Sequence, residues 1–544
     1  MNKKVSISVS AVTALSLVLL SACTSDKAGQ EQVADANRQP AAPSNLNASG
    51  FPIVKQPLTM SAMVLLSPSQ PTNWNDILAW QEYEKMTGIH IDWKAHTSAD
   101  ITEKRNLALA SNQLPDIFYR TKTPDSDVDK YGAEGSFMKL NGLIDQYAPN
   151  FKALMQKYND VRKGVQTADG SIYAMPYLTD SPSIEITSKL FLNQEWLKKT
   201  GKKLPTTTDE LTDVLTAFRD GDPNGNGKQD EVPLTSDTLD KLIWILRGSF
   251  GLANKGVGNE NWDVDPKSGK LRFFPASEGY KELMAYMRKL YENKLIDQEI
   301  FTNDGKKVLA KNEQNQIGAF AFGNIVALAN KNANDFVGLG TALAGPHGDR
   351  LFTSARGHFG AKGAFMISSS NKNPEAAMRW IDYFYGEEGI RMLYMGIEGT
   401  TYQKDSSGNY DFIPKLTENI PAGSSFDQVI SKYVPYAGGS LPTIILEKYF
   451  KGGETQPAAK AAAENLQPYL PKELWAPFGF TAQESADKQS LEADINGLVK
   501  QRTAEFIQGK VSIDKFDDYV AQLNKMGLGD LQKMYETAYE RYKK

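Results

Sequence analysis

The order of extended and helical segments in residues 58–118 narrows the fold more than any other feature of the chain. Residues 58–66, 89–94 and 114–118 have the composition of strands, and residues 75–86 and 101–110 have helical spacing. Gly88 ends the first helical segment. This alternation is typical of a doubly wound parallel sheet. The sequence therefore predicts an α/β fold whose ligand lies beyond the carboxyl ends of the strands.

The length of 544 residues indicates two or more domains. Further strands are expected at 317–322 and 362–368, further helices at 280–295 and 374–385, and a mostly helical end from residue 485. The composition is that of a globular protein, with 41% hydrophobic and 23% charged residues. A net charge of −4 gives no sign of a nucleic-acid partner.

The first 22 residues have the pattern of a secretion signal. Lys3 and Lys4 precede an apolar run over residues 5–20, which is too short for a membrane span. Cys23 is the only cysteine, so it forms no internal disulfide. Leu20-Ser-Ala-Cys23 resembles the bacterial lipobox, which implies lipid attachment at Cys23 on the outer face of a membrane. An ordinary signal peptide with an incidental cysteine is the alternative.

Residues 23–56 are rich in Ala, Ser, Asn, Gln, Pro and Gly and have no apolar period. Such a segment is typical of a flexible tether. Folded protein is therefore expected to start near Pro57.

Residues 222–231 have the spacing of a calcium loop, with oxygen side chains at Asp222, Asn224, Asn226, Asp230 and Glu231. Gly227 stands at the sixth position, where such a loop turns sharply, and the carbonyl of Lys228 would be the ligand at position seven. Position twelve of the loop, where such loops have a bidentate Glu, is Pro233. Glu231 at position ten would therefore complete the coordination shell of the ion. Hard oxygen ligands favour calcium, here a structural ion, over zinc. A solvated turn is the alternative.

Several motifs in a fixed order carry a resemblance to a known family: Leu114-Pro-Asp-Ile117, Gly170-Ser-Ile-Tyr-Ala-Met-Pro-Tyr177, Asp222–Glu231, Asn373-Pro-Glu-Ala-Ala377, Gly396-Ile-Glu-Gly399 with Tyr402, and Phe516-Asp-Asp-Tyr519. In these motifs the chain resembles the extracellular solute-binding proteins of bacterial ABC importers. Within that family it is similar to the large lipoproteins that take up oligosaccharides, related to the alginate-binding proteins.

The resemblance implies two α/β lobes joined by a hinge, with the ligand in the cleft between them. Lobe 1 would comprise residues 57–180 and 357–402, and lobe 2 residues 181–356 and 403–544 with the calcium loop. The chain would cross between lobes near 178–182, 353–357 and 399–404. The implied activity is binding without chemistry, by a monomer that delivers an oligosaccharide to a membrane permease.

A sugar site needs aromatic platforms and planar hydrogen-bonding groups, and six residues near the expected cleft qualify: Trp74, Tyr119, Arg120, Tyr177, Trp244 and Arg356. Trp74 lies in a polar loop after a strand, so Trp74→Ala is expected to weaken sugar binding without loss of stability. For Trp244 the alternative is a helix core. Arg120 or Arg356 would suit a uronic acid, with a surface salt bridge as the alternative.

Enzymatic alternatives have little support in the sequence. There are four histidines, and neither Gly-x-Ser-x-Gly nor His-Glu-x-x-His occurs. A glycosidase needs two facing carboxylates, and no local pattern selects such a pair. The alternatives left open are a secreted, lipid-anchored polysaccharide hydrolase or lyase and a calcium-dependent surface adhesin.

Overall fold

The computed structural model describes residues 45–544 except 419, 422–425 and 436–439. The predicted signal peptide, Cys23 and most of the tether lie outside the described residues. Residues 45–56 were expected in the tether, but they are folded. Leu46 forms a bridge with Val54, and Ile53 is buried and donates its backbone N–H to the carbonyl of Thr87 at 2.9 Å. Folded structure therefore already includes residue 45.

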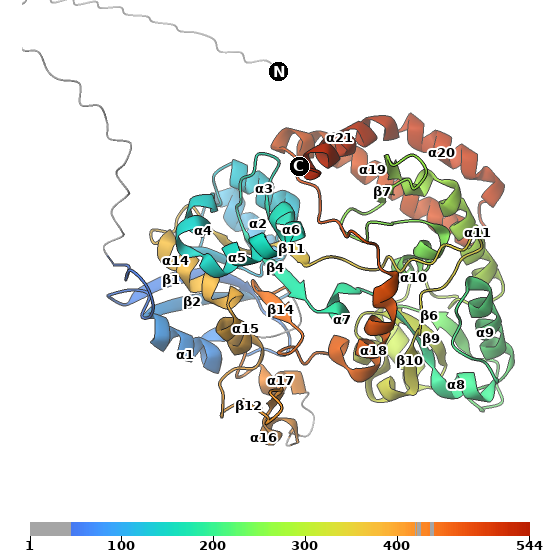
Figure 1. The fold of residues 1–544 in the computed structure, drawn as a ribbon, viewed down its shortest axis with the longest axis horizontal. Coiled ribbons are helices and arrows are strands. Elements are labelled where there is room, and N and C mark those ends of the chain that lie inside the picture. Colours follow the sequence, from blue (N-terminus) through green and yellow to red (C-terminus); the bar gives the residue numbers. More distant parts are fainter. Residues whose placement is uncertain (1–44, 419, 422–425, 436–439) are drawn as a thin grey trace, which may run out of the picture. The chain divides into compact units, whose positions relative to one another are not determined.

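The first sheet has six strands in the order β14-β4-β11-β3-β1-β2 (Figure 1). Their bounds are β1 Leu58–Leu65, β2 Ile89–His96, β3 Ile117–Tyr119, β4 Met175–Asp180, β11 Phe359–Ile367 and β14 Ile444–Leu446. Strand β1 is parallel to β2 and β3, as predicted, and β14 is parallel to β4. Strand β11 runs antiparallel between β3 and β4.

The second sheet has four strands in the order β10-β5-β9-β6. They are β5 Lys189–Asn193, β6 Val232–Thr235, β9 Ile317–Phe322 and β10 Phe336–Gly338. Strands β6 and β9 are parallel, so their carboxyl ends lie at the same edge of the sheet. A separate hairpin is formed by β7 Trp262–Val264 and β8 Leu271–Phe273.

Each sheet has its own hydrophobic core, covered by its own helices. The helices packed with the first sheet are α1 Leu78–Thr87, α2 Ile101–Ser111, α3 Asp125–Ala133, α4 Asn141–Tyr147, α5 Pro149–Lys157, α6 Asn159–Val165, α14 Pro374–Asp382 and α15 Glu387–Tyr394. Those packed with the second are α8 Gln194–Lys199, α9 Thr208–Asp220, α10 Leu239–Leu246, α11 Glu278–Glu292, α12 Gly305–Glu313, α13 Ile325–Ala329, α18 Pro457–Leu466, α19 Ala482–Ile507, α20 Phe516–Lys525 and α21 Leu528–Tyr542.

Three connections carry the chain between the two sheets. The first leaves β4, passes through α7 (Pro182–Glu185) and enters β5, and the second lies between β10 and β11. Both lie near their predicted positions. The third expected crossing, at 399–404, is wrong. Strand β14 pairs with β4 in the first sheet and α18 packs against β10, so the crossing lies between Leu446 and Pro457. Residues 403–446 were assigned to lobe 2, but those described here pack with the first sheet, as Tyr402 and Tyr449 do.

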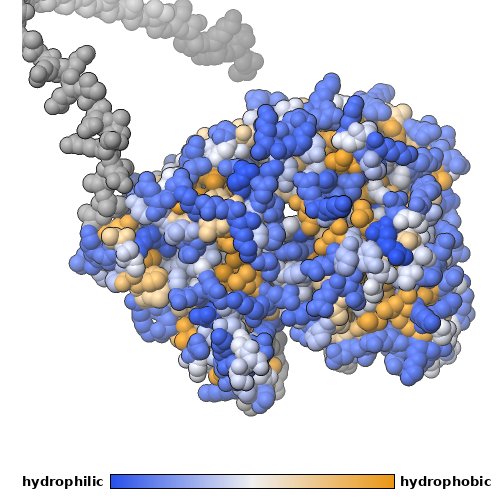
Figure 2. Space-filling model, viewed as in Figure 1, coloured by the Kyte–Doolittle hydropathy of each residue, from blue (hydrophilic) through white to orange (hydrophobic). Residues whose placement is uncertain are grey.

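Hydrophilic residues cover most of the face shown in Figure 2. Within the described part of the chain, no helix combines the length and the apolar character that a membrane span requires.

Candidate functional site

Trp74 and Tyr119, two of the six predicted sugar contacts, lie in an aromatic core of the first sheet. Both side chains are 0% exposed. The ring of Trp74 lies 5.1 Å from that of Trp93 and 6.1 Å from that of Trp80, which stacks on Trp380 at 5.6 Å. A ring enclosed in this way presents no face to a sugar. The predicted stacking roles of Trp74 and Tyr119 are therefore wrong for this structure.

The local structure around Trp74 explains the error. Residues Trp74–Asp76 form a short 3-10 helix, and the side chain of Asn73 caps it by accepting from the N–H of Asn75 at 3.1 Å. The polar neighbours stay at the surface while this turn directs the indole inward. A polar loop can therefore supply a core residue.

Arg120 lies where predicted, directly after β3, and its backbone has a φ of 54°. Its Nη1 donates to Ser67 Oγ at 3.1 Å, and Ser67 follows β1. Nearby, the buried Arg105 donates to the carbonyl of Thr121 at 3.1 Å. The carboxyl ends of β1 and β3 are thus joined by polar contacts. Arg120 itself is only 7% exposed.

The carboxyl ends of β6 and β9 form a second group of polar and aromatic side chains. Lys241 on α10 lies 2.7 Å from both carboxylate oxygens of Asp237, which follows β6. The same ammonium lies 3.8 Å from the ring centre of Phe322, the last residue of β9. Each of these three residues is partly exposed. They therefore form an accessible patch with an aromatic face and two charged groups.

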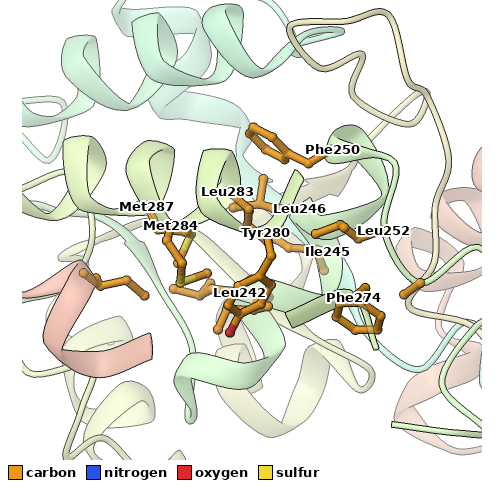
Figure 3. Packing of buried hydrophobic residues seen from close by; sticks show 14 of the residues in the cluster. Leu242, Ile245, Leu246, Phe250, Leu252, Phe274, Tyr280, Leu283, Met284 and Met287 are labelled. Atoms are coloured by element: carbon orange, nitrogen blue, oxygen red, sulfur yellow. The ribbon is translucent and has the colours of Figure 1, made fainter. Parts of the chain in front are cut away.

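Trp244 lies on α10 three residues after Lys241, so both side chains occupy the same side of the helix. The opposite side packs Leu242, Ile245 and Leu246 into the core against α11 (Figure 3). Seven of the eight tryptophans are buried, and Trp244 is the one that is partly exposed. Of the predicted aromatic contacts, Trp244 is therefore the one with an available ring.

Tyr177 and Arg356 are brought together at the crossings. The Arg356 guanidinium lies 5.5 Å from the ring centre of Tyr177, and burial raises the pKa of this tyrosine. A Cβ on Gly360 would lie 2.3 Å from the Tyr177 ring, so the ring packs on that glycine backbone. Arg356 Nε is buried and has no protein partner among the described residues. This donor is therefore unpaired but buried, and the Tyr177 ring is enclosed.

The first two crossings are joined by backbone hydrogen bonds on either side of α7, and the two segments are here called the hinge ribbon (residues 179–187 and 354–358). Ile186 bridges Ala355, Thr187 N donates to Ser354 O at 2.9 Å, and Arg356 N donates to Glu185 O at 3.0 Å. At the base of the ribbon, the fully buried Lys189 donates from Nζ to the carbonyls of Ser183 and Ile186 at 2.6 and 2.9 Å. Burial lowers the pKa of Lys189 to about 8.

Ionisable side chains gather on the hinge ribbon. A carboxylate oxygen of Asp180, one of Glu185 and a ring nitrogen of His358 lie within 4.8 Å of one another. His358 Nδ1 lies 3.3 Å from Asp160 of α6, whose other oxygen accepts the N–H of Phe359 at 3.0 Å. Burial raises the pKa of Glu185 to about 7, against the lowering effect of His358. Burial lowers the pKa of His358, whereas the contact with Asp160 raises it. The net result is a pKa above the ordinary value.

The candidate calcium loop connects α9 to β6. Asp222 has a φ of 42°, and its carboxylate accepts the backbone N–H groups of Gly225, Asn226 and Gly227, each at 3.1 Å. The amides of Asn224 and Asn226 both donate to Asp230 at 3.0 Å. The predicted oxygen side chains therefore converge within one closed turn.

Glu231 gives a separate indication that the loop suits a cation. Its Oε1 is buried and has no hydrogen-bond partner among the described residues, and burial raises its pKa. An unpaired buried carboxylate oxygen is costly unless a cation or donor compensates it. A hard divalent ion would therefore fit the carboxylates of Asp222, Asp230 and Glu231 together with the carbonyl of Lys228.

Comparison with known proteins identifies the family. Residues 79–422 match the model of the bacterial extracellular solute-binding proteins. The fructooligosaccharide ABC transporter substrate-binding protein FusA of Streptococcus pneumoniae is 30% identical over 90% of this chain and 92% of its own. The chain belongs to the bacterial extracellular solute-binding proteins.

Solved structures and a second relative agree with this family. FusA in complex with kestose aligns with a TM-score of 0.72 and 29% identity, covering 89% of this chain and 99% of FusA. An EF-hand mutant of FusA with fructo-nystose aligns equally well, with a TM-score of 0.72 and 28% identity over the same shares. The polygalacturonan/rhamnogalacturonan-binding protein YtcQ of Bacillus subtilis is 24% identical over 89% of this chain and 92% of its own.

Membership of this solute-binding family confirms the two-lobed fold and the prediction of a binding protein rather than an enzyme. Sequence reasoning missed the patch of Asp237, Lys241 and Phe322 and the charged groups of the hinge ribbon. The helical spacing of Asp237, Lys241 and Trp244, directly after a strand, was an available signal for the first. The second set comes from segments about 200 residues apart, so no local pattern reveals it.

Proposed function

We propose that this solute-binding protein captures an oligosaccharide and delivers it to the membrane permease of an ABC importer. The observation that carries the proposal is Trp244, the tryptophan that remains partly exposed, on α10 three residues after the Lys241 that lies at the carboxyl ends of two parallel strands. Ligands of α/β proteins bind at such ends. Phe322 and the charged groups of Lys241 and Asp237 supply an additional ring face and partners for sugar hydroxyls.

The first ligand to test is a fructo-oligosaccharide, because FusA, whose structure was solved in complex with kestose, aligns over 89% of this chain. Arg356, with its unpaired Nε, and Arg120 are the proposed polar contacts nearer the hinge and the first sheet. Arg120 already contacts Ser67 and is 7% exposed, which favours a neutral ligand over a uronate.

A ligand panel tests this proposal directly. Kestose, nystose, oligogalacturonides and neutral glucans are titrated into the protein from Asn45 onward, with calcium present, and heat of binding and unfolding temperature are measured. Kestose and nystose are expected to bind and to raise the unfolding temperature. Binding of the oligogalacturonides alone would make the ligand a uronate and Arg356 the residue to substitute. Failure of every sugar to bind would contradict the proposed function.

Attachment of the mature protein to the outer face of the membrane through lipid on Cys23 is part of the same proposal. Two acyl chains give a stable anchor, whereas one gives only reversible binding. A tether of about 20 residues would then separate the lipid from the first folded residues, which leaves the protein free to meet the permease.

We also propose that the loop of residues 222–231 binds a structural calcium ion. Excess chelator is then expected to lower the unfolding temperature by several degrees, because an ion bound only by the folded state stabilises it by about 2.7 kcal/mol at a hundred times its Kd. Differential scanning calorimetry with and without calcium measures this. Asp222→Asn, which removes a ligand charge, is the matched control and should be nearly insensitive to chelator. Equal melting in calcium and chelator would contradict the ion site.

A further inference from the structure

Four ionisable side chains lie close together on and beside the hinge ribbon. Asp180 ends β4 and Glu185 ends α7 in its first segment, His358 comes from its second segment, and Asp160 from the adjoining helix α6. The nearest donor and acceptor atoms of Asp180, Glu185 and His358 lie within 4.8 Å of one another. These four residues are named the hinge cluster.

Charged and titratable groups surround the hinge cluster on every side. Those packed nearby are Lys157 and Tyr158 between α5 and α6, Lys189 below α7, Glu447 and Lys460 beyond the third crossing, and Arg356 in the ribbon itself. Lys157 lies 3.6 Å from Asp180, but its side chain is 63% exposed. Glu447 accepts from the hydroxyls of Ser181 and Ser183 and pairs with Lys460, so its charge is compensated separately.

The hinge cluster contains three carboxyl groups and one imidazole. Asp160 has the contact with His358 and a backbone N–H, and Asp180 accepts from the hydroxyl of Tyr158 at 2.5 Å. Among the described residues, Glu185 accepts one hydrogen bond, from the N–H of Ser181 at 3.2 Å. Glu185 is therefore the carboxylate whose negative charge is least compensated, and it is the group that gains most from a proton.

We propose that the hinge cluster binds a proton, centred on Glu185, whose occupancy changes as the hinge ribbon bends, so that ligand binding is linked to pH near neutrality. The inference rests on the proposed function, because it is the captured sugar that selects the closed form. Bending moves one segment of the ribbon relative to the other and to α6, and so changes the distances between Glu185, His358 and Asp160. Interactions between charges only a few ångströms apart depend steeply on distance.

Linkage makes the effect reciprocal and therefore measurable. If closure changes the proton affinity of Glu185, then sugar binding must take up or release a fraction of a proton. Kestose is titrated into the calcium-loaded protein at pH 7 in two buffers that differ in ionisation enthalpy. The difference in observed heat gives the number of protons exchanged, expected at about 0.2–1 per bound sugar.

Glu185→Gln keeps the size of the side chain and an oxygen for Ser181 N–H, and is expected to bind kestose with proton exchange near zero. Glu447→Gln lies on the same hinge outside the hinge cluster and should exchange protons like the wild type. Binding with no proton exchange, or exchange that Glu185→Gln leaves unchanged, would overturn the hinge proposal alone. Absence of binding to any panel sugar would overturn the proposed function and this linkage with it.

A measurement without sugar checks that Glu185 titrates in the folded protein. The pKa of Glu185 is higher folded than unfolded, so the folded state holds the extra proton and its stability falls as pH rises toward 7. Urea unfolding at pH 5.5 and pH 8 should show a larger loss of stability in the wild type than in Glu185→Gln. The same loss in both would overturn the proposal even where kestose binds.

Discussion

Trp74→Ala is expected to lower the free energy of unfolding by about 3–5 kcal/mol. The indole is 0% exposed and contacts Trp80, Trp93 and Tyr119. Its removal leaves a cavity in a rigid aromatic cluster that has little freedom to collapse, and the cost of such substitutions grows with the residual cavity. Urea denaturation at fixed calcium concentration measures the change.

The structure thus reverses the expectation drawn from the polar loop around Trp74. Trp74→Phe, which retains most of the apolar volume, should recover a large part of the lost stability. The Trp74→Ala protein that remains folded should bind kestose with nearly unchanged affinity, because the ring lies away from solvent. Normal stability together with lost sugar binding would contradict this assignment and return Trp74 to the binding site.

Trp244→Ala is expected to have the opposite result, with a 10- to 100-fold weaker affinity for kestose and a small change in stability. The partly exposed ring would lose its stacking contact with the sugar, at a cost of about 1.4–2.8 kcal/mol. The core-facing residues of α10, Leu242, Ile245 and Leu246, are untouched by this substitution. Isothermal titration calorimetry gives the affinity, and calorimetric melting gives the stability.

Two observations add to the Trp244 test. Trp244→Phe keeps a ring face and should lose less affinity than Trp244→Ala. The seven other tryptophans are buried, so a change in exposed indole fluorescence on adding sugar should disappear in both variants. Wild-type affinity in Trp244→Ala would place the ligand elsewhere, and the residues around Arg356 would then be tested first.

Local pattern was sufficient for most elements of the fold. The alternation over residues 58–118 became β1, α1, β2, α2 and β3 with small shifts at the ends, because periodicity reports directly which face of a segment is buried. The candidate calcium loop, residues 222–231, forms a closed turn between α9 and β6, since side chains of nearby residues hold its backbone. The direction in which strands pair could not be predicted from local pattern. Strand β11 is antiparallel within a sheet that local alternation predicts as parallel.

The candidate site was less predictable than the fold because burial of single side chains depends on tertiary contacts. Trp74 and Trp244 both follow strands, yet one is enclosed by Trp80 and Trp93 while the other stays partly exposed. The third crossing was misplaced for a similar reason. The strand Ile444–Leu446 has only three residues, too few for a sequence pattern to predict it. Its partner β4 lies more than 260 residues earlier in the sequence.

That distant pairing has a consequence for the order of folding. During synthesis, β4 has no partner on its β14 side until the ribosome has passed residue 446, by which time all four strands of the second sheet have been made. A contact between such separated residues carries a high loop-closure cost and slows folding. The first sheet is consequently completed only after all strands of the second sheet have been synthesised. A fragment ending before residue 444 would keep an open sheet edge, a surface prone to aggregation.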